Sequence, residues 1–264
     1  MFKLLGNDFN EEEIKKWYKE EEEYHNQFTG GRNDADEYWS IYEEFNRRYA
    51  INEYVKFGKE TRILSFGCAE GSDTAKLYKE HRFRLYGLEP SEQLISAFKK
   101  GFPESEIVKA NTVGKIDYPS DFFDYIFCFG VLHHIPNVSF VLKEFHRVLR
   151  EDGIAIIREP ICWMYSGDVR PKDLSPNERG IPVEFFIEEF ANLNFDVLRI
   201  KYSYYKPLMH FVRKSPYLWK FPALIYRMDN ILSMIPNRKN YFSRNLIDKF
   251  NAGCAYYVIK KRKI

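Results

Sequence analysis

Three groups of residues in this chain of 264 have types and spacing that suit chemistry. Gly67-Cys-Ala-Glu-Gly71 lies between an apolar run and a segment with helical spacing, so a ligand can approach its backbone and meet unpaired N–H groups. Glu89 ends the next apolar run, about 20 residues after the turn, where a carboxylate can accept both ribose hydroxyls of an adenosine. His133 and His134 follow a later apolar run, and a neutral imidazole there can accept a proton near pH 7.

The glycine turn does not fit two common phosphate-binding motifs. A nicotinamide dinucleotide site needs G-x-G-x-x-G, but counting from Gly67 the second and third positions are Ala69 and Ser72. A P-loop is excluded because no Gly-Lys-Ser/Thr follows the turn. Together with Glu89, the pattern favours the ribose of an adenosine. The alternative is a tight turn without a ligand and a surface carboxylate.

Alternating apolar and helical segments must position these groups. The apolar runs predict seven strands, at residues 62–66, 83–88, 106–109, 123–129, 154–157, 195–200 and 255–260. Helical spacing predicts helices over 10–57 with a turn at 29–33, and over 91–100, 138–149 and 183–193. This order predicts an α/β fold with a mostly parallel sheet, which binds ligands outside the carboxyl ends of its strands.

The elements also predict how the chain is divided. Residues 1–60 form an N-terminal helical lid, and residues 61–202 with 251–264 form the core. Residues 203–250 lie where two consecutive strands need only a short hairpin, so we interpret them as a helical insertion that completes the lid. Ser72, Asp73 and Asn137 are predicted to begin helices as capping or first-turn residues.

Three segments, residues 63–71, 85–91 and 123–136, give the chain a family resemblance. In combination they resemble class I S-adenosylmethionine (SAM)-dependent methyltransferases, specifically the small-molecule group related to the quinone-biosynthesis enzymes. The resemblance implies a Rossmann-like seven-stranded sheet whose last strand is antiparallel. It also implies SAM as cofactor, S-adenosylhomocysteine as product and no metal.

The resemblance carries cofactor-binding roles to particular positions, with two departures. Members often have an acid at the position of Ser65, for the methionine end of SAM, and Asp at the position of Asn111, for the adenine amino group. An amide oxygen still accepts a hydrogen bond, whereas Ser65 leaves the SAM amine to another anchor, such as the carbonyl of Gly67 or Phe129 or an N-terminal aromatic residue. The predicted cofactor residues are Gly67, Ala69, Gly71, Glu89, Pro90, Asn111, Thr112 and Phe129.

The acceptor side is predicted from residues after the fourth and fifth strands. His133 and His134 are the predicted catalytic pair, with His134 preferred as general base; the alternative is that one of them caps a helix or packs under the lid. Methyl transfer otherwise needs mainly alignment of the reacting atoms. The predicted substrate-binding residues are Arg158, Glu159, Arg170 and Arg179.

The acceptor itself is predicted from a long charged loop. Its Asn177-Glu-Arg-Gly-Ile181 stretch resembles methyltransferases of bacterial capsule and surface polysaccharide pathways, and its arginines suit an anionic acceptor. We therefore expect O-methylation of a nucleotide-activated sugar or of a phosphoryl or phosphoramidate group, and no nucleic-acid partner. The alternatives are an RNA or protein methyltransferase and a non-catalytic SAM-binding scaffold.

The distribution of charge and the cysteines indicate the partners and the compartment of the protein. Residues 1–60 carry 15 acidic and 9 basic side chains, whereas residues 201–264 carry 14 basic and 2 acidic ones. The basic, aromatic C-terminal part is either a solvated face or attracts anions, including an anionic membrane surface that the protein contacts peripherally. Four dispersed cysteines without a C-x-x-C pair, and a start without a signal-peptide pattern, predict a cytoplasmic protein.

Overall fold

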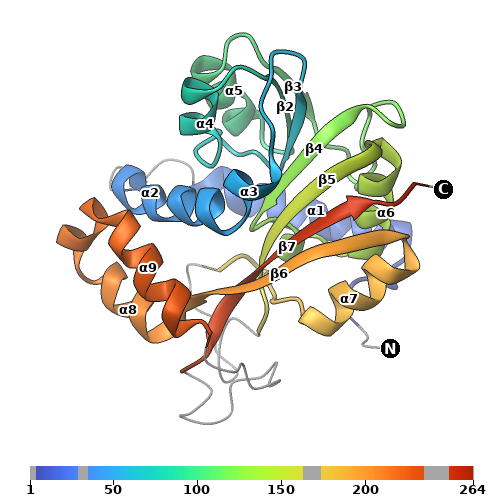
Figure 1. Cartoon of the computed structure of the whole chain (residues 1–264). Helices are drawn as coiled ribbons and strands as arrows, with labels where there is room; N and C mark the ends of the chain where they lie inside the picture. The colour runs from blue at the N-terminus through green and yellow to red at the C-terminus, as the bar shows by residue number, and fades with distance from the viewer. Residues whose placement is uncertain (1–3, 29–34, 163–173, 235–249, 264) are drawn as a thin grey trace.

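A computed structural model describes residues 4–28, 35–162, 174–234 and 250–263. Seven strands among them form one sheet in the order β3-β2-β1-β4-β5-β7-β6 (Figure 1). The strands are β1 (Arg62–Phe66), β2 (Arg84–Glu89), β3 (Glu106–Lys109), β4 (Phe123–Phe129), β5 (Leu149–Pro160), β6 (Phe195–Tyr205) and β7 (Ala252–Lys261).

The strand directions confirm the predicted Rossmann-like fold. β1 to β5 pair in parallel, whereas β7 runs antiparallel to both of its neighbours, β5 and β6. The prediction was wrong about the lengths of β5, β6 and β7, which extend beyond their apolar runs. In β5 the polar segment 150–153 looks like a turn, but Leu149 pairs with Phe123 across an irregularity in the register and so starts the strand earlier.

Helices flank the sheet where helical spacing predicts them, including the N-terminal region. The helix α1 begins at a capping box, in which the Asn10 side chain accepts from the Glu12 and Glu13 amides and the Glu13 carboxylate accepts from the Asn10 amide. The helices are α1 (Glu11–Phe28), α2 (Ala35–Asn46), the π-helix η1 (Arg47–Ile51), α3 (Asn52–Tyr54), α4 (Ala75–Glu80), α5 (Glu92–Gly101), the 3-10 turn η2 (Leu132–His134), α6 (Val138–Val148), α7 (Val183–Asn192), α8 (Lys206–Arg213), the 3-10 turn η3 (Pro216–Lys220) and α9 (Pro222–Leu232).

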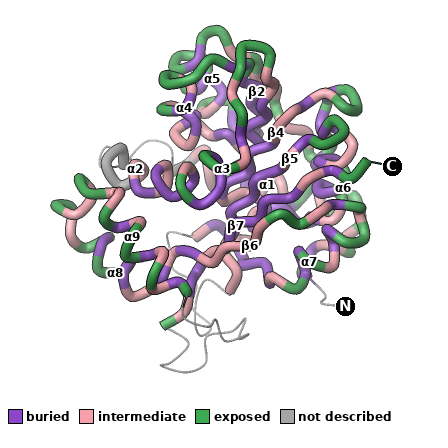
Figure 2. The backbone as a smooth tube through the Cα atoms, viewed as in Figure 1, coloured by how far each residue is buried: buried purple, intermediate pink, exposed green. Residues whose placement is uncertain are grey.

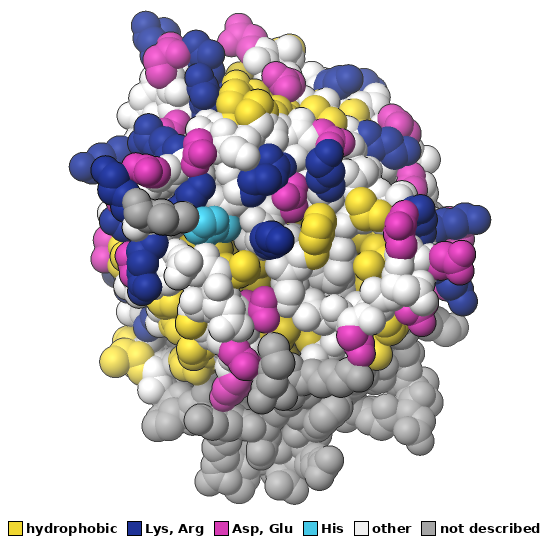
Figure 3. Space-filling model, turned by 90° about the vertical axis from the view of Figure 1, so that its right-hand side faces the viewer, with side chains coloured by type: hydrophobic (Ala, Val, Ile, Leu, Met, Phe, Trp, Pro, Cys, Tyr) yellow, Lys and Arg dark blue, Asp and Glu magenta, His cyan; other side chains and the backbone are white. Residues whose placement is uncertain are grey.

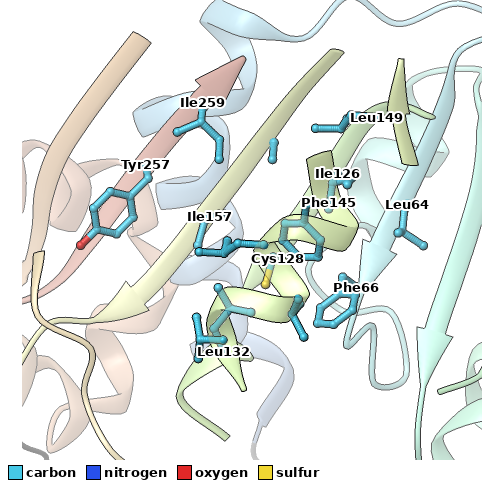
Figure 4. Close-up of a cluster of buried hydrophobic side chains, with 14 of the residues drawn as sticks. Leu64, Phe66, Ile126, Cys128, Leu132, Phe145, Leu149, Ile157, Tyr257 and Ile259 are labelled. Carbon is cyan, nitrogen blue, oxygen red and sulfur yellow. The ribbon is translucent and has the colours of Figure 1, made fainter. Parts of the chain in front are cut away.

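The core lies on both faces of the sheet, because alternate strand residues point to opposite sides. In β4, Ile126 packs with Phe145 of α6, whereas Phe127 packs on the other face in the cluster that contains Phe45 of α2. Figure 2 shows the buried strands between the partly exposed helices, and Figure 4 shows the α6 side of the core. Burying one such Phe contributes about 1.5–3 kcal/mol, so the two apolar layers fix the sheet and the edge that it presents.

The N-terminal helices and the insertion meet each other on one side of the molecule. Asp229 of α9 is buried and accepts hydrogen bonds from the Tyr49 hydroxyl (2.8 Å) and from the amides of Tyr204 and Tyr205. The insertion follows β6, which runs parallel to β5, so α8 starts at the edge where the parallel strands end. The division of the chain into lid, core and insertion stays a prediction.

Two predicted capping residues have other partners. The residue before α4 is Thr74, not Ser72 or Asp73, and its side chain makes no capping bond. Asp73 instead accepts a hydrogen bond from Asn46 at 2.7 Å. Asn137 does precede α6, but its amide donates to the Val113 carbonyl (2.9 Å) and therefore anchors a neighbouring loop.

The turn after β1 has no room for a side chain at Gly71, which gives a first prediction. Gly71 has a φ of +92°, and an added Cβ would lie 2.1 Å from Cε2 of the buried Phe102. We expect Gly71→Ala to lower the free energy of unfolding by about 2 kcal/mol or more, measured by chemical denaturation. The matched control is Gly101→Ala in α5, where no atom lies within 4 Å of the added Cβ. That control should be neutral or slightly stabilising, and equal midpoints for the two variants would refute the prediction.

Candidate functional site

The turn after β1 brings backbone to the carboxyl edge of the sheet. Gly67 and Ala69 have φ values of 64° and 45°, in the left-handed region. The Gly67 amide donates to the Leu88 carbonyl of β2 at 2.8 Å. An added Cβ at Gly67 would lie 2.5 Å from Val131, so only glycine allows the turns after β1 and β4 to approach so closely.

Glu89 holds its carboxylate beside this turn. Oε2 accepts from the Ala69 amide at 3.0 Å, and Oε1 accepts from the Ser91 amide at 3.1 Å. The side chain is buried, and burial raises the pKa of its carboxyl to about 7 in spite of the two backbone donors. Each oxygen keeps a second lone pair that a ribose hydroxyl can use, and the ribose contact of Glu89 stays a prediction.

The other predicted cofactor residues lie along the same edge, and one expected contact is replaced. Pro90 is half-buried after Glu89, Thr112 is exposed after β3, and Phe129 ends β4 with a buried ring. Asn111 closes its own loop: Oδ1 accepts from the amides of Val113 and Lys115, and Nδ2 donates to the Lys115 carbonyl. The adenine contact expected of Asn111 is therefore wrong for this conformation, because both acceptor positions of its amide oxygen are used.

His133 is paired on both ring nitrogens. Nδ1 lies 2.7 Å from Glu159 Oε2, and Nε2 lies 3.5 Å from Glu178 Oε1. Burial alone would lower the pKa of His133, but the two carboxylates raise it to about 9. The same interactions outweigh burial at Glu178 and lower its pKa to about 2. The predicted general-base role does not suit His133, because both of its ring nitrogens face carboxylates inside the protein.

Glu159 is a structural carboxylate and not a substrate ligand. Its side chain is fully buried. Oε1 accepts from the amides of Val131 (2.8 Å) and Leu132 (2.7 Å), while Oε2 is bonded to the His133 ring. The expected substrate contact is corrected, because every short contact of this carboxylate serves the turn after β4.

His134 is the member of the pair with more exposure. Its Nδ1 lies 2.8 Å from Glu21 Oε2 and 3.2 Å from the Ser175 hydroxyl. Its carbonyl accepts from the Trp17 indole at 2.7 Å, so helix α1 holds both its backbone and its ring. The sequence left two alternatives for the pair, a catalytic role or packing inside the protein. His133 is packed inside, whereas His134 lies at the carboxyl edge under α1.

Arg158 and Arg179 are both buried. The Arg158 guanidinium donates to Asn46 at 2.8 Å, lies 3.7 Å from an Asp73 oxygen and covers the Tyr42 ring. It joins α2 to the end of β5 and is not open to an anionic acceptor in this arrangement.

Arg179 holds the chain that follows the histidine pair. It donates to the carbonyls of His133 (3.2 Å), Ile135 (2.8 Å) and Pro136 (3.2 Å) and lies over the Trp17 ring. The expected substrate contact is replaced by this structural role, because the guanidinium donates to backbone carbonyls instead. Arg170, the remaining predicted substrate residue, lies outside the described residues.

Sequence reasoning missed the partners that α1 supplies. The run of four glutamates at 20–23 is typical of a solvated face, yet Glu21 is buried and His25 lies one helical turn further on. Burial and the neighbouring His134 lower the pKa of His25 to about 4. The i,i+4 spacing of Glu21 and His25 was the available signal, since it puts both on one side of a helix.

The raised pKa of Glu89 predicts how SAM binding depends on pH. The ribose hydroxyls donate to the ionised carboxylate, so affinity should fall about tenfold from pH 8 to pH 6, measured by calorimetry. The Glu89→Gln variant should bind SAM weakly and without this pH dependence, whereas Glu92→Gln, an exposed neighbour, should behave as wild type. A wild-type SAM affinity independent of pH between 6 and 8 would contradict the assignment.

The same carboxyl affects the stability of the protein without SAM. Because its pKa in the folded state exceeds the usual 4.5, its contribution to the free energy of unfolding should fall as pH rises from 4.5 to 7.

The position of Arg179 predicts a loss of stability instead of a loss of substrate binding. Arg179→Ala removes the donor from three carbonyls in a buried site and should lower the free energy of unfolding by about 2–4 kcal/mol, measured by chemical denaturation. Arg82→Ala, at an exposed position before β2, is the control and should change stability by less than about 0.5 kcal/mol. A fully stable Arg179→Ala protein would restore the substrate role.

Comparison with known proteins finds a family match and several relatives. A family model described as a methyltransferase domain matches residues 64–157, from β1 into β5. The chain is 27% identical over 189 residues to a tRNA U34 carboxymethyltransferase of Campylobacter lari, covering 69% of this chain and 60% of that protein. It is 29% identical over 155 residues to the protein of that name from Sulfurimonas denitrificans, covering 57% of this chain and 51% of that protein. The chain thus spans only about half to three fifths of these relatives.

A solved structure shares the whole fold at low identity. A SAM-dependent methyltransferase of Thermotoga maritima, described as a possible histamine N-methyltransferase, matches with a TM-score of 0.58 and 17% identity, covering 94% of this chain and 100% of that one. The matched domain contains the glycine turn, Glu89 and the histidine pair, which are the parts that the resemblance in sequence relied on. Residues 64–157 thus match a methyltransferase domain, the described elements have the fold of solved SAM-dependent methyltransferases, and SAM is the cofactor that this match implies.

Proposed function

We propose that this methyltransferase acts on RNA, transferring the methyl group of SAM to a base or sugar atom of a nucleotide at the carboxyl edge. The observation that carries the proposal is an exposed basic and aromatic surface on the insertion, in a chain whose curated relatives are named for tRNA. RNA was the alternative in the sequence interpretation, and the relatives favour it over the polysaccharide pathway.

The surface in question, here the α8–α9 surface, is formed by the described part of the insertion. Arg213, Lys214, Lys220 and Arg227 are exposed there, and the one acidic residue of segment 206–234, Asp229, is buried. By contrast, the face drawn in Figure 3 carries Lys and Arg interspersed with Asp and Glu. A patch of one sign attracts a polyanion, and mixed charges do not.

Aromatic side chains accompany these cations. Phe211, Tyr217 and Phe221 are exposed on α8, η3 and the start of α9, with Tyr217 at 72% relative exposure. Unpaired bases stack on exposed aromatic rings while cations bind the phosphates, so the combination suits single-stranded RNA. The surface begins at the end of β6, the edge where the predicted SAM residues lie.

The part of the carboxyl edge around His134, here the acceptor edge, suits an uncharged reacting group. Arg158 and Arg179, which were expected to bind an anionic acceptor, are used internally. The side chains nearest His134 include the carboxylate of Glu21 and the carboxylate of Glu178. A phosphate at this edge is disfavoured by these charges, whereas a nucleobase or ribose is not. This removes the support for the polysaccharide acceptor, which rested on the loop around Arg179.

Each part of the chain has a defined task in this proposal. SAM supplies an electrophilic methyl group when bound. Glu89 and the turn at Gly67–Gly71 hold the adenosine, and His134, whose ring is fixed by Glu21, lies where the acceptor would approach. The protein mainly aligns the two reactants, because an in-line displacement depends on their relative position.

The transferred group is a methyl group in this proposal, although the relatives are named as carboxymethyltransferases. A carboxymethyl group carries a negative charge and needs a cation beside it. Among the described residues of the acceptor edge, Arg158 and Arg179 are already engaged and Glu21 and Glu178 are acidic. Mass spectrometry of RNA after reaction with SAM distinguishes one added methyl group from one added carboxymethyl group.

Charge removal on the α8–α9 surface tests the RNA proposal. The triple variant Lys214→Gln/Lys220→Gln/Arg227→Gln should weaken binding of a fluorescent tRNA at least tenfold at low salt, measured by anisotropy. The slope of log K against log salt should decrease by about one for each phosphate that the variant no longer neutralises. SAM affinity should not change, because the cofactor residues lie elsewhere.

The matched control removes three lysines from α1. Lys15→Gln/Lys16→Gln/Lys19→Gln changes the net charge equally, but each lysine faces a glutamate one turn away. Equal weakening in both triple variants would show unspecific attraction and contradict the surface assignment. Binding to anionic vesicles without binding to RNA would instead support the predicted peripheral membrane contact and overturn the RNA proposal. Among the described helices, none has the length and apolar composition to cross a bilayer.

A further inference from the structure

Histidines and glutamates from four separate segments meet at the acceptor edge. They come from α1, from the turn after β4, from the end of β5 and from the segment before α7. This group, here the histidine cluster, consists of Glu21, His25, His133, His134, Glu159 and Glu178.

Two imidazole rings converge on one carboxylate oxygen within this cluster. Glu21 Oε2 lies 2.8 Å from His134 Nδ1 and 3.8 Å from His25 Nε2. One donor atom from each of the three residues lies within 4.8 Å of the other two. Donor atoms around a tetrahedral zinc ion, with bonds of about 2.0–2.1 Å, are about 3.3 Å apart, so small side-chain movements would complete the site.

Further groups orient the Glu21 carboxylate. Its other oxygen, Oε1, accepts from the Ser175 hydroxyl at 2.9 Å and from the Asn177 amide at 3.2 Å. Oε2 is thereby directed at the two imidazoles. Hydrogen bonds that hold a carboxylate in this way are typical of metal ligands.

A second set of donors adjoins the first. His133, His134 and Glu178 also have one donor atom each within 4.8 Å of one another. The His133 Nδ1 is bonded to Glu159, which leaves Nε2 directed toward Glu178. A histidine whose second nitrogen donates to a carboxylate is the usual arrangement of a metal-bound imidazole.

The charge of the cluster also favours a cation. Glu21 and Glu159 are buried and Glu178 is half-buried, so three carboxylates share a site with little access to water. The nearby guanidinium of Arg179 is directed at the carbonyls of residues 133, 135 and 136. Buried carboxylates are stable when they are paired or bind a metal ion.

We propose that Glu21, His25 and His134 form a binding site for a divalent transition-metal ion, with His133 and Glu178 as adjoining donors. Imidazole together with carboxylate suits zinc and its neighbours better than magnesium. The ion would join α1 to the turn after β4 across the acceptor edge and leave a coordination position for water or acceptor. The proposal departs from the sequence prediction of no metal and does not depend on RNA being the acceptor.

Direct titration tests the site. The full chain, stripped with a chelator, should bind one equivalent of Zn²⁺ in competition with a chromogenic chelator, and excess Mg²⁺ should not displace it. The variant Glu21→Gln/His25→Ala should weaken zinc binding by at least about 100-fold, because two of three central donors are lost. The control Glu23→Gln/His210→Ala changes the same residue types at exposed positions and should bind as wild type.

A spectroscopic measurement on the wild-type chain covers the case in which the double variant does not fold. With Co²⁺ in place of zinc, visible ligand-field bands of a tetrahedral or five-coordinate nitrogen and oxygen site are expected. Less than one equivalent of bound zinc, or wild-type affinity in the folded double variant, would overturn the proposal. So would a cobalt spectrum identical to that of the hydrated ion. A failure of RNA methylation leaves these outcomes unaffected.

Discussion

The buried carboxylate of Glu159 is the interaction on which the acceptor edge depends. It lies at the end of β5 with no exposed surface, and it accepts from the amides of Val131 and Leu132 and from the ring of His133. A buried carboxylate is stable only when its oxygens accept hydrogen bonds. The turn after β4 supplies these donors, so the carboxylate of Glu159 fixes the conformation of that turn. This turn places His134 at the acceptor edge and directs the His133 carbonyl toward the Arg179 guanidinium.

Helix α1 depends on that turn and extends its effect along the sheet. Glu21 reaches His134 after β4, Glu22 pairs with Lys109 at the end of β3, and Asn26 bonds to Ser91 after β2. One helix therefore contacts the segments at the ends of β2, β3 and β4, on the side where parallel sheets bind ligands. The N-terminal helix α1 therefore supplies side chains to the candidate site and does not only cover it.

The sequence predicts the elements that local patterns determine. Strands such as β4 are apolar runs, broken there only by Asp124, and the glycine turn and Glu89 lie a short, fixed distance apart along the chain. The sequence did not predict the hydrogen-bond partners of the polar side chains. Arg179 and Asn111 both have chemistry that fits a ligand, but both bond to backbone groups: Arg179 to a distant segment that tertiary packing brings near, and Asn111 to its own loop. In the same way, Glu21 differs from its acidic neighbours only in the direction that it faces once α1 packs on the sheet.

The distribution of charge limits the kind of acceptor that this edge can take. A phosphate about 5 Å from a carboxylate such as Glu21 or Glu178 meets a repulsion of about 3 kcal/mol at an effective dielectric constant of 20. A divalent ion would balance the carboxylates of the histidine cluster without making it strongly positive. Phosphates more than a Debye length away, about 8 Å in physiological salt, escape most of this repulsion. In the proposed function RNA would meet both conditions, because a base or ribose would enter this edge while the phosphates would lie on the α8–α9 surface. A small acceptor whose phosphate sits next to its reacting oxygen meets neither.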